Sequence, residues 1–169
     1  MTYTNTAVRG FSEASFAADT ETKMIPACGC ADSNHADVKR MTYLIDDLAE
    51  SAFSISFVVA DKGYDAEYVH REIRERLHAE TMIPLRNMAK PSKGESTKKA
   101  RGFYRGVMKH CFDKGIYSRR SQIETVNSMI KRKMGDVVYG RSETSRHKEV
   151  LFRCIAHNLR RLIDLKYSP

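Results

Sequence analysis

The first pattern along the chain is a pair of apolar-rich segments around a polar tetrapeptide. Residues 11–18 and 23–30 flank Asp19-Thr20-Glu21-Thr22, whose composition suits a turn, so the opening predicts a β-hairpin. Between His35 and Phe53, apolar residues recur at spacings of three and four, which predicts an amphipathic helix. These residues are Val38, Met41, Leu44, Ile45 and Leu48.

A strand, a helix and a second strand are predicted next. Residues 55–60 (Ile-Ser-Phe-Val-Val-Ala) form a run rich in β-branched and aromatic side chains, which is typical of a buried strand. Residues 66–78 have a helical pattern, and Thr81 to Leu85 read as another strand. Together they predict a parallel β-α-β unit with a right-handed crossover.

The turn after the first of these strands carries the first candidate functional residue. Gly63 permits a sharp turn, and Asp65 is expected to cap the helix that follows. Asp61 therefore lies at the carboxyl end of a strand, the edge of an α/β sheet where ligands usually bind.

Two further helices are predicted over residues 119–134 and 143–166. In the first, Ile123, Val126, Ile130 and Met134 form an apolar stripe, and Arg120, Glu124, Asn127 and Lys131 form a polar stripe beside it. The second has a broad apolar face made of Val150, Leu151, Cys154, Ile155, Leu159, Leu162 and Ile163. The chain thus reads as one α/β domain over residues 1–169, in which residues 86–114 form a basic loop.

The composition and the distribution of charge indicate what kind of partner the protein binds. The 169 residues carry a net charge of +8, and 41% are hydrophobic, as in an ordinary globular domain. From Arg86 to Lys133 there are fourteen Lys and Arg against three acids, so the basic charge is concentrated in the middle of the chain. This distribution favours nucleic acid as the partner. A lysine-rich solvated loop is the simpler reading, and RNA binding is a third, although aromatic residues are sparse in the basic stretch.

The sequence disfavours a membrane or secreted protein, a disulfide framework and a zinc site. No apolar run approaches the roughly twenty residues that cross a bilayer, and the first fifteen residues lack a signal-peptide core, so we expect a cytoplasmic, nucleoid-associated protein. The four cysteines lack the spacing of a disulfide framework. Cys28, Cys30 and His35 resemble half a zinc site, but the usual Cys-x2-Cys spacing is absent.

Asp61 and Glu124 are the two carboxylates best placed for metal chemistry. A strand-end Asp and a helical Glu beside the sheet offer the oxygen ligands that Mg²⁺ or Mn²⁺ prefers, with substrate phosphate completing the shell. Each also has a simpler reading. Asp61 could cap its own turn, and Glu124 could pair with Arg120 on the helix surface.

Four residues at fixed spacings favour the functional interpretation of Asp61 and Glu124 over the simpler one. Tyr117, Arg120, Glu124 and Lys131 fit Tyr-x2-Arg-x3-Glu-x6-Lys, which resembles the signature of DDE transposases from insertion sequences. The segment Val59-Ala-Asp-Lys-Gly-Tyr-Asp65 is similar to the region around the second catalytic Asp of that family. The resemblance implies a ribonuclease H-like α/β fold, with a mixed sheet and flanking helices, that cuts and rejoins transposon ends.

The resemblance also assigns roles to residues. Asp61 and Glu124 would bind Mg²⁺ or Mn²⁺, Arg120 and Lys131 would contact phosphates near the scissile bond, and Tyr117 would support the helix or a terminal base. The partner would be double-stranded DNA, as transposon ends and as target, with a second copy or a full-length transposase as a further partner. The expected DNA-contacting cations are Lys98, Lys99, Arg101, Arg119, Arg120, Lys131, Arg132 and Lys133.

One departure from the family pattern limits the expected activity. The first catalytic Asp of the family lies on a strand before the hairpin, but residues 1–10 contain no acid. Asp19 is expected in a turn, and Asp37 is better explained as stabilising the start of a helix. We therefore expect an incomplete fold that lacks the first sheet strand, with impaired or absent strand transfer. The alternative is a non-catalytic DNA-binding remnant that occupies ends or pairs with a full-length enzyme.

Overall fold

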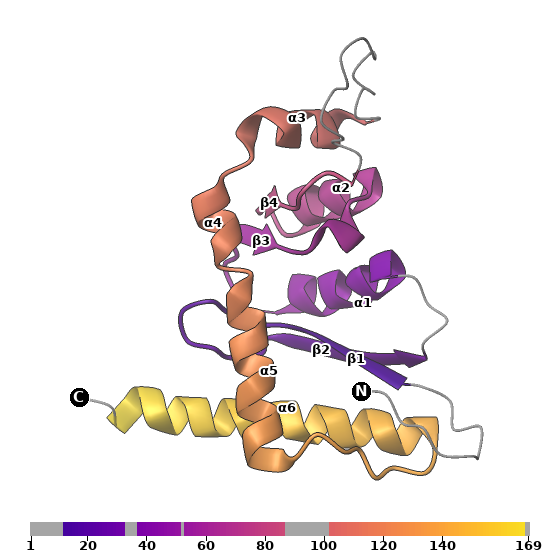
Figure 1. Cartoon of the computed structure of the whole chain (residues 1–169), viewed down its shortest axis with the longest axis vertical. Coiled ribbons are helices and arrows are strands. Elements are labelled where there is room, and N and C mark those ends of the chain that lie inside the picture. Colours follow the sequence, from indigo (N-terminus) through magenta and orange to yellow (C-terminus); the bar gives the residue numbers. More distant parts are fainter. Residues whose placement is uncertain (1–11, 33–36, 52, 87–101, 168–169) are drawn as a thin grey trace, which may run out of the picture. The chain divides into compact units, whose positions relative to one another are not determined.

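The computed structural model describes residues 12–32, 37–51, 53–86 and 102–167 (Figure 1). The chain divides into two compact units. The first comprises Met1–Ser51 with Ser121–Pro169, and the second comprises Ala52–Arg120. Both contain helices and strands, so the predicted α/β class is confirmed.

The first unit opens with the predicted hairpin. Strands β1 (Ser12–Ala17) and β2 (Ala27–Asp32) pair antiparallel, with Ser12 opposite Asp32 and Ala17 opposite Ala27. In the connecting turn, the backbone N–H of Asp19 donates to Met24 O at 2.8 Å, and its carboxylate accepts from Thr22 N at 2.7 Å. Asp19 is thus a turn residue, as expected.

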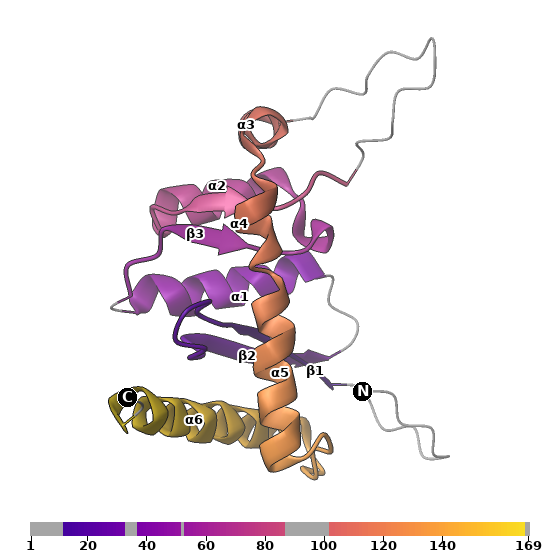
Figure 2. The same cartoon turned by 60° about the vertical axis from the view of Figure 1, so that its left-hand side comes forward.

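Helices cover both sides of this hairpin. Helix α1 (Asp37–Glu50) packs on β2 with Met41, Leu44, Ile45 and Leu48 buried, as the spacing predicted. Helix α6 (Glu143–Tyr167) packs on the other side, so the hairpin lies between α1 and α6 (Figures 1 and 2). The amide of Asn158 fixes α6 to the hairpin, because its Oδ1 accepts from Ile25 N and its Nδ2 donates to Ile25 O, each at 2.8 Å.

Helix α5 (Ser121–Met134) completes the apolar core of this unit. Val126 and Ile130 are buried with Ile25 and Cys154, and Ile123 and Met134 are half-buried, so the predicted apolar stripe is confirmed. The predicted helix began two residues too early. Arg119 and Arg120 instead donate their N–H groups to Ile116 O and to Tyr117 O, which completes the turn before α5.

The second unit contains the predicted β-α-β arrangement. Strands β3 (Phe57–Val59) and β4 (Glu80–Met82) pair in parallel and are joined by α2 (Glu67–Arg76). The fully buried side chains of this unit include Val69, Ile73, Ile83 and Met108. The expectation that β3 is buried is wrong, because Phe57 is 44% exposed and β3 pairs with β4 alone among the described strands.

The expected loop over residues 86–114 is partly helical. Residues 87–101 lie outside the described residues, but α3 spans Phe103–Cys111 and α4 spans Lys114–Ser118. Gly102 precedes α3 with a φ of 118°, and a Cβ there would collide with the carboxylate of Glu67. That carboxylate accepts from Tyr104 N and Arg105 N at 3.0 Å, so it caps α3 from another helix. Sequence periodicity missed α3 because this cap comes from a distant residue.

The described strands form two separate two-stranded sheets, one antiparallel and one parallel. A single mixed sheet was expected, and it is not present among the described strands. Within the same parts of the chain, no helix is long and apolar enough to cross a membrane.

Candidate functional site

Asp61 lies two residues after the end of strand β3, close to where the sequence placed it. Its Oδ1 accepts from Lys62 N at 3.0 Å, so the carboxylate caps the short 3₁₀ helix η1 (Lys62–Tyr64). The side chain is 56% exposed. The simple reading of Asp61 as a turn cap is therefore correct, and the exposed carboxylate also keeps lone pairs for another ligand.

Arg120 and Tyr117 lie in the same unit as Asp61. The guanidinium of Arg120 lies 3.6 Å from Asp61 Oδ2, so these two signature residues form an ion pair. Tyr117 is half-buried in α4, and its ring packs against Phe112 with a centroid distance of 5.3 Å. The backbone carbonyl of Tyr117 also accepts from Arg120 N at 3.0 Å.

Glu124 and Lys131 lie on α5, in the other unit. Both are exposed, and their spacing of seven residues places them on one face of the helix. Glu124 is in the first turn and Lys131 in the last, where each charge also complements the helix dipole. Packing of Val126 and Ile130 fixes the rotation of α5 and keeps that face outward.

The expected DNA-contacting cations fall into two groups. Arg119, Lys131, Arg132 and Lys133 are exposed, and the last three crowd the final turn of α5. Lys98, Lys99 and Arg101 lie outside the described residues. The zinc alternative depends on Cys30 and His35, whose side chains are also outside them.

Asp65 has a role that the sequence did not predict. It was expected to cap α2, but the residue at the cap position is Ala66, which makes no side-chain cap. The carboxylate of Asp65 is instead fully buried and forms a bidentate ion pair with Arg105, at 2.8 Å to Nε and 2.7 Å to Nη2. It also accepts from Arg86 N at 2.7 Å. Since these partners are 40 and 21 residues away, no local signal could have revealed them.

Two neutral polar residues extend this buried network. His70 Nε2 faces Asp65 Oδ1 at 3.4 Å, and His70 Nδ1 lies 2.8 Å from Thr81 Oγ1. Donation from Nε2 to the carboxylate requires Nδ1 to accept from the Thr81 hydroxyl. Burial lowers the pKa of His70, and the Asp65 carboxylate opposes this only in part, so the imidazole is neutral. For Asp65, burial raises the pKa, but hydrogen bonds from Arg105 and Arg86 outweigh it and lower the pKa overall.

Among the described residues, no group of three or more His, Cys, Asp or Glu side chains is arranged to hold a metal ion. The donor chemistry of Asp61 nevertheless fits a divalent ion, because its exposed carboxylate oxygens are the ligand type that Mg²⁺ and Mn²⁺ prefer.

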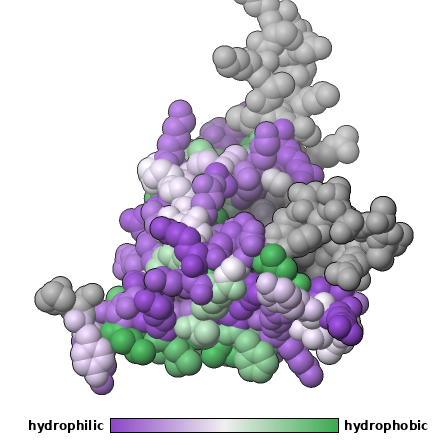
Figure 3. Space-filling view, turned by 60° about the horizontal axis from the view of Figure 1, so that its bottom comes forward, coloured by the Kyte–Doolittle hydropathy of each residue, from purple (hydrophilic) through white to green (hydrophobic). Residues whose placement is uncertain are grey.

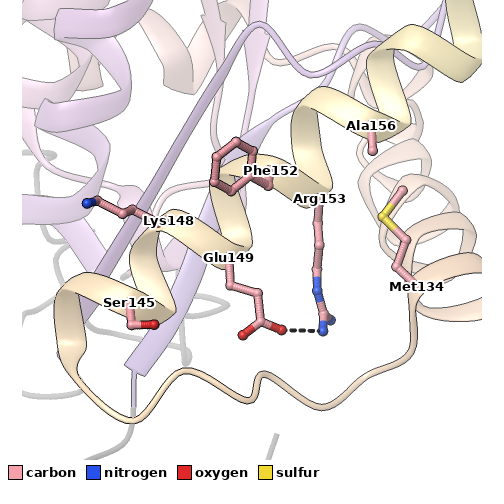
Figure 4. A pocket seen from close by; sticks show the side chains of 7 residues that line it. All are labelled: Met134, Ser145, Lys148, Glu149, Phe152, Arg153 and Ala156. Atoms are coloured by element: carbon pink, nitrogen blue, oxygen red, sulfur yellow. Dashed lines mark hydrogen bonds and ion pairs between the residues drawn. The ribbon is translucent and has the colours of Figure 1, made fainter.

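Two shallow depressions are present on the surface of the first unit, and no signature residue is among the residues that line them. One, of about 520 Å³, is lined by Met134 at the end of α5 and by α6 residues from Ser145 to Ala156 (Figure 4). Glu149, one of the lining residues, accepts from Tyr139 N and Gly140 N and pairs with Arg153 at 2.6 Å. Ten residues of helix, about 15 Å, separate Met134 from Glu124, so this depression is not the expected metal site.

Comparison with protein families identifies the chain. Comparison with curated proteins finds no match, and comparison with solved structures finds none either. Residues 2–159 match the family described as the transposase DDE domain, a family of DNA-acting proteins that generally use divalent metal ions. That match covers almost the whole chain, including Asp61 and the signature from Tyr117 to Lys131. The chain therefore belongs to the transposase DDE domain family and has a role in transposition.

Proposed function

We propose that this chain binds transposon-end DNA and that its signature residues serve divalent-metal-dependent cleavage and transfer of DNA strands. The observation that carries the proposal is the exposed Asp61 carboxylate at the carboxyl end of β3, ion-paired to Arg120 of the signature. An exposed carboxylate beside an arginine matches the needs of a site that holds both a cation and a phosphate.

Asp61 and Glu124 are the residues that would hold the ion. When bound, a Mg²⁺ or Mn²⁺ ion would polarise the scissile phosphate and lower the pKa of the attacking hydroxyl or water. Arg120, which pairs with Asp61, would contact a phosphate oxygen of the DNA, since carboxylate and phosphate both suit its guanidinium. Tyr117 would hold the end of α4, and thereby Arg120, in place.

The remaining cations would position the duplex. Lys131, Arg132 and Lys133 present three charges from one helical turn, and exposed Arg119 adds another near Arg120. Lys98, Lys99 and Arg101 extend the same charge along the chain. Contacts of this kind give affinity without sequence preference and depend strongly on salt.

We further propose that the fold is ribonuclease H-like and that the chain by itself cleaves weakly. The combination of an antiparallel hairpin, a parallel β3–β4 pair and packed helices supports a fold of this α/β type. Residues 1–10 offer no acid, so the two carboxylates at Asp61 and Glu124 lack the third of the family pattern. With fewer ligands, both the affinity for the ion and the geometry of its shell should suffer.

The proposal is tested with purified chain, a labelled 30-base-pair duplex and a supercoiled plasmid. Binding to the duplex is measured by fluorescence anisotropy at increasing salt. Replacing Lys131, Arg132 and Lys133 by Gln should reduce the slope of log K against log salt by about 0.9 for each phosphate that these side chains neutralise. Plasmid nicking is followed with Mg²⁺ or Mn²⁺ and with EDTA.

Glu124→Gln should abolish any metal-dependent nicking and leave duplex binding nearly unchanged. Glu143→Gln is the matched control, because Glu143 is an acid in the first turn of α6, as Glu124 is in α5. Duplex binding without metal-dependent nicking would favour the non-catalytic DNA-binding alternative. A chain that does not bind duplex at low salt would contradict both readings.

A further inference from the structure

Two cysteines that lie far apart in the sequence meet in the core of the first unit. Cys28 is on β2 and Cys154 is on α6, and both are free thiols. Cys154 is buried in the cluster with Ile25, Val126 and Ile130, and the half-buried Cys28 packs against the same cluster. The two thiols are hydrogen-bonded to each other, so their sulfur atoms are in direct contact.

Hydrogen bonds between α6 and the hairpin hold the two thiols together. Asn158, one turn after Cys154, bonds both backbone groups of Ile25, three residues before Cys28. Two further side chains of α6 contact carbonyl oxygens of the hairpin: His157 lies 2.8 Å from Lys23 O, and Arg161 donates to Thr22 O at 2.9 Å. These contacts fix the rotation of α6, so Cys154 faces β2.

The side of α6 that faces away from the hairpin is also apolar. Phe152, Ile155 and Leu159 are 45–67% exposed. Figure 3, in which the lower side of Figure 1 comes forward, shows hydrophobic colour along this helix. Because both sides carry apolar residues, the sequence pattern placed Cys154 in one broad face with Ile155 and Leu159. The structure separates them and turns Cys154 towards Cys28.

We propose that Cys28 and Cys154 form a redox-sensitive thiol pair, which hydrogen peroxide converts to a disulfide. In the first step, the Cys28 sulfur attacks the O–O bond and becomes a sulfenic acid, and the other oxygen leaves as water. In the second, the Cys154 sulfur attacks the Cys28 sulfur, the S–O bond breaks, and the hydroxyl leaves as water with the Cys154 proton. Two thiols thus lose two electrons, and one peroxide is reduced to two water molecules.

The environments of the two thiols assign the order of the steps. The hydrogen bond from Cys154 lowers the pKa of Cys28, although burial and the nearby Asp47 carboxylate oppose this change. The same hydrogen bond and burial raise the pKa of Cys154. Since the thiolate is the nucleophile, the less buried Cys28 reacts with the peroxide, and Cys154 keeps its proton until the second step.

The disulfide would join β2 to α6 beside the bonds of Asn158. It would close a long loop of chain and so restrict the unfolded state, which should raise the temperature of unfolding. This inference goes beyond the DNA chemistry proposed above and does not depend on it.

The test uses the full chain with Cys30→Ser and Cys111→Ser, in which Cys28 and Cys154 are the remaining cysteines. After hydrogen peroxide, thiols titrated in denaturant should fall from two per chain to none, and dithiothreitol should restore both. On a non-reducing gel the protein should remain a single chain, and mass spectrometry should find the tryptic peptides 24–39 and 154–160 joined. Oxidation should raise the midpoint of thermal unfolding by about 5–15 °C.

Replacing either thiol tests the order of the steps. With Cys154→Ala, the sulfenic acid at Cys28 has no second thiol to meet, so dimedone should label Cys28 about tenfold more than in the parent chain. With Cys28→Ala, Cys154 should stay unlabelled, because its sulfur remains a buried thiol. Circular dichroism checks that each variant folds.

The matched control moves the thiol along the same helix. Val150→Cys combined with Cys154→Ala keeps a thiol beside the same cluster but shifts it by one turn, about 6 Å. That shift exceeds the reach of a disulfide, so this variant should not form one with Cys28.

Three results would contradict the proposal. Two free thiols in the folded parent chain after peroxide would overturn it, as would a disulfide that joins only separate chains. Equal yields with the thiol at position 150 and at position 154 would show that the contact does not direct the reaction. Dimedone labelling of Cys154 in the Cys28→Ala chain would overturn the order of the steps.

Discussion

The cores of the two units differ in how many charged and polar groups they bury, although the unit with α6 also buries His157. In the unit that contains Asp61, the fully or almost fully buried groups include Asp65, His70 and Thr81 beside Val69 and Ile73. In the unit that contains α5 and α6, the buried cluster is Ile25, Val126, Ile130 and Cys154, with apolar neighbours around it.

This difference separates two ways of positioning a functional residue. Glu124 owes its place to non-directional packing, which fixes the rotation of α5 but tolerates changes in shape. Asp61 lies four residues before Asp65, whose charge-assisted hydrogen bonds demand particular angles and distances. We therefore expect the stability of the unit with α5 and α6 to depend mainly on the volume of its buried side chains. The stability of the unit with Asp61 should depend mainly on its buried charges.

Among these changes, removing the charge of Arg105 should reduce the free energy of unfolding most. Arg105→Met leaves the fully buried Asp65 carboxylate without its bidentate partner, which should reduce the free energy of unfolding by about 3–5 kcal/mol. Urea denaturation followed by circular dichroism measures the loss. The double variant Asp65→Asn/Arg105→Met should recover part of it, since no buried charge then remains. A double variant less stable than Arg105→Met would contradict this account.

Truncating Ile130 is the matching change in the apolar core. Ile130→Ala removes three buried carbon atoms and leaves a cavity, at a cost of about 2–4 kcal/mol. Because no charge is involved, the cost should be the same in low and high salt. Urea denaturation at two salt concentrations checks this. A cost that changes with salt by more than the experimental error would show that the contrast between the cores is wrong.

Acid should destabilise the second unit in two stages. The pKa of His70 is lowered in the folded state, so its contribution is complete above the unfolded pKa of about 6.5 and is lost as the pH falls towards the folded value. The pKa of Asp65 is also lowered, so its contribution is lost at lower pH, below about 3.9. The free energy of unfolding, measured from pH 8 to pH 3, should show both stages.

His70→Gln isolates the first stage. Glutamine remains neutral over this range and keeps a side-chain donor and an acceptor. The variant should therefore lose the decline that begins near pH 6.5 and retain the one at lower pH. An unchanged profile would assign the first stage to another group.

The Asp61–Arg120 ion pair should contribute least to stability. Both side chains are about a third or more exposed, so solvent screens the pair and its coupling should be about 0.2–1 kcal/mol. A double-mutant cycle with Asp61→Asn and Arg120→Gln measures it in thermal unfolding. A coupling above about 2 kcal/mol would make the pair structural and would weaken its assignment to phosphate and metal binding.

Local periodicity predicted most of the secondary structure. The hairpin, α1, the β-α-β unit, α5 and α6 follow from side-chain spacings of two, three and four and from turn residues such as those at 19–22. The place of Asp61 after β3 was also predictable, because a strand-ending turn is a local event. These features depend on neighbours within a few residues.

Features that depend on distant partners were not predictable. Asp65 looked like a helix cap, since nothing near it shows that Arg105 lies within hydrogen-bonding distance. Helix α3 looked like loop, because Glu67 provides its cap from 37 residues away. The division of α6 into a packed face and an exposed stripe also depends on tertiary packing, because both sides carry apolar residues.

Asp65 also binds the chain at both borders of residues 87–101. Its carboxylate accepts from Arg86, just before that segment, and from Arg105, just after it. A peptide bond cut between these residues, or a reporter domain inserted there, would leave both new ends attached to one carboxylate. The Asp65 carboxylate therefore acts as a clasp that joins Arg86 and Arg105 independently of the peptide chain between them.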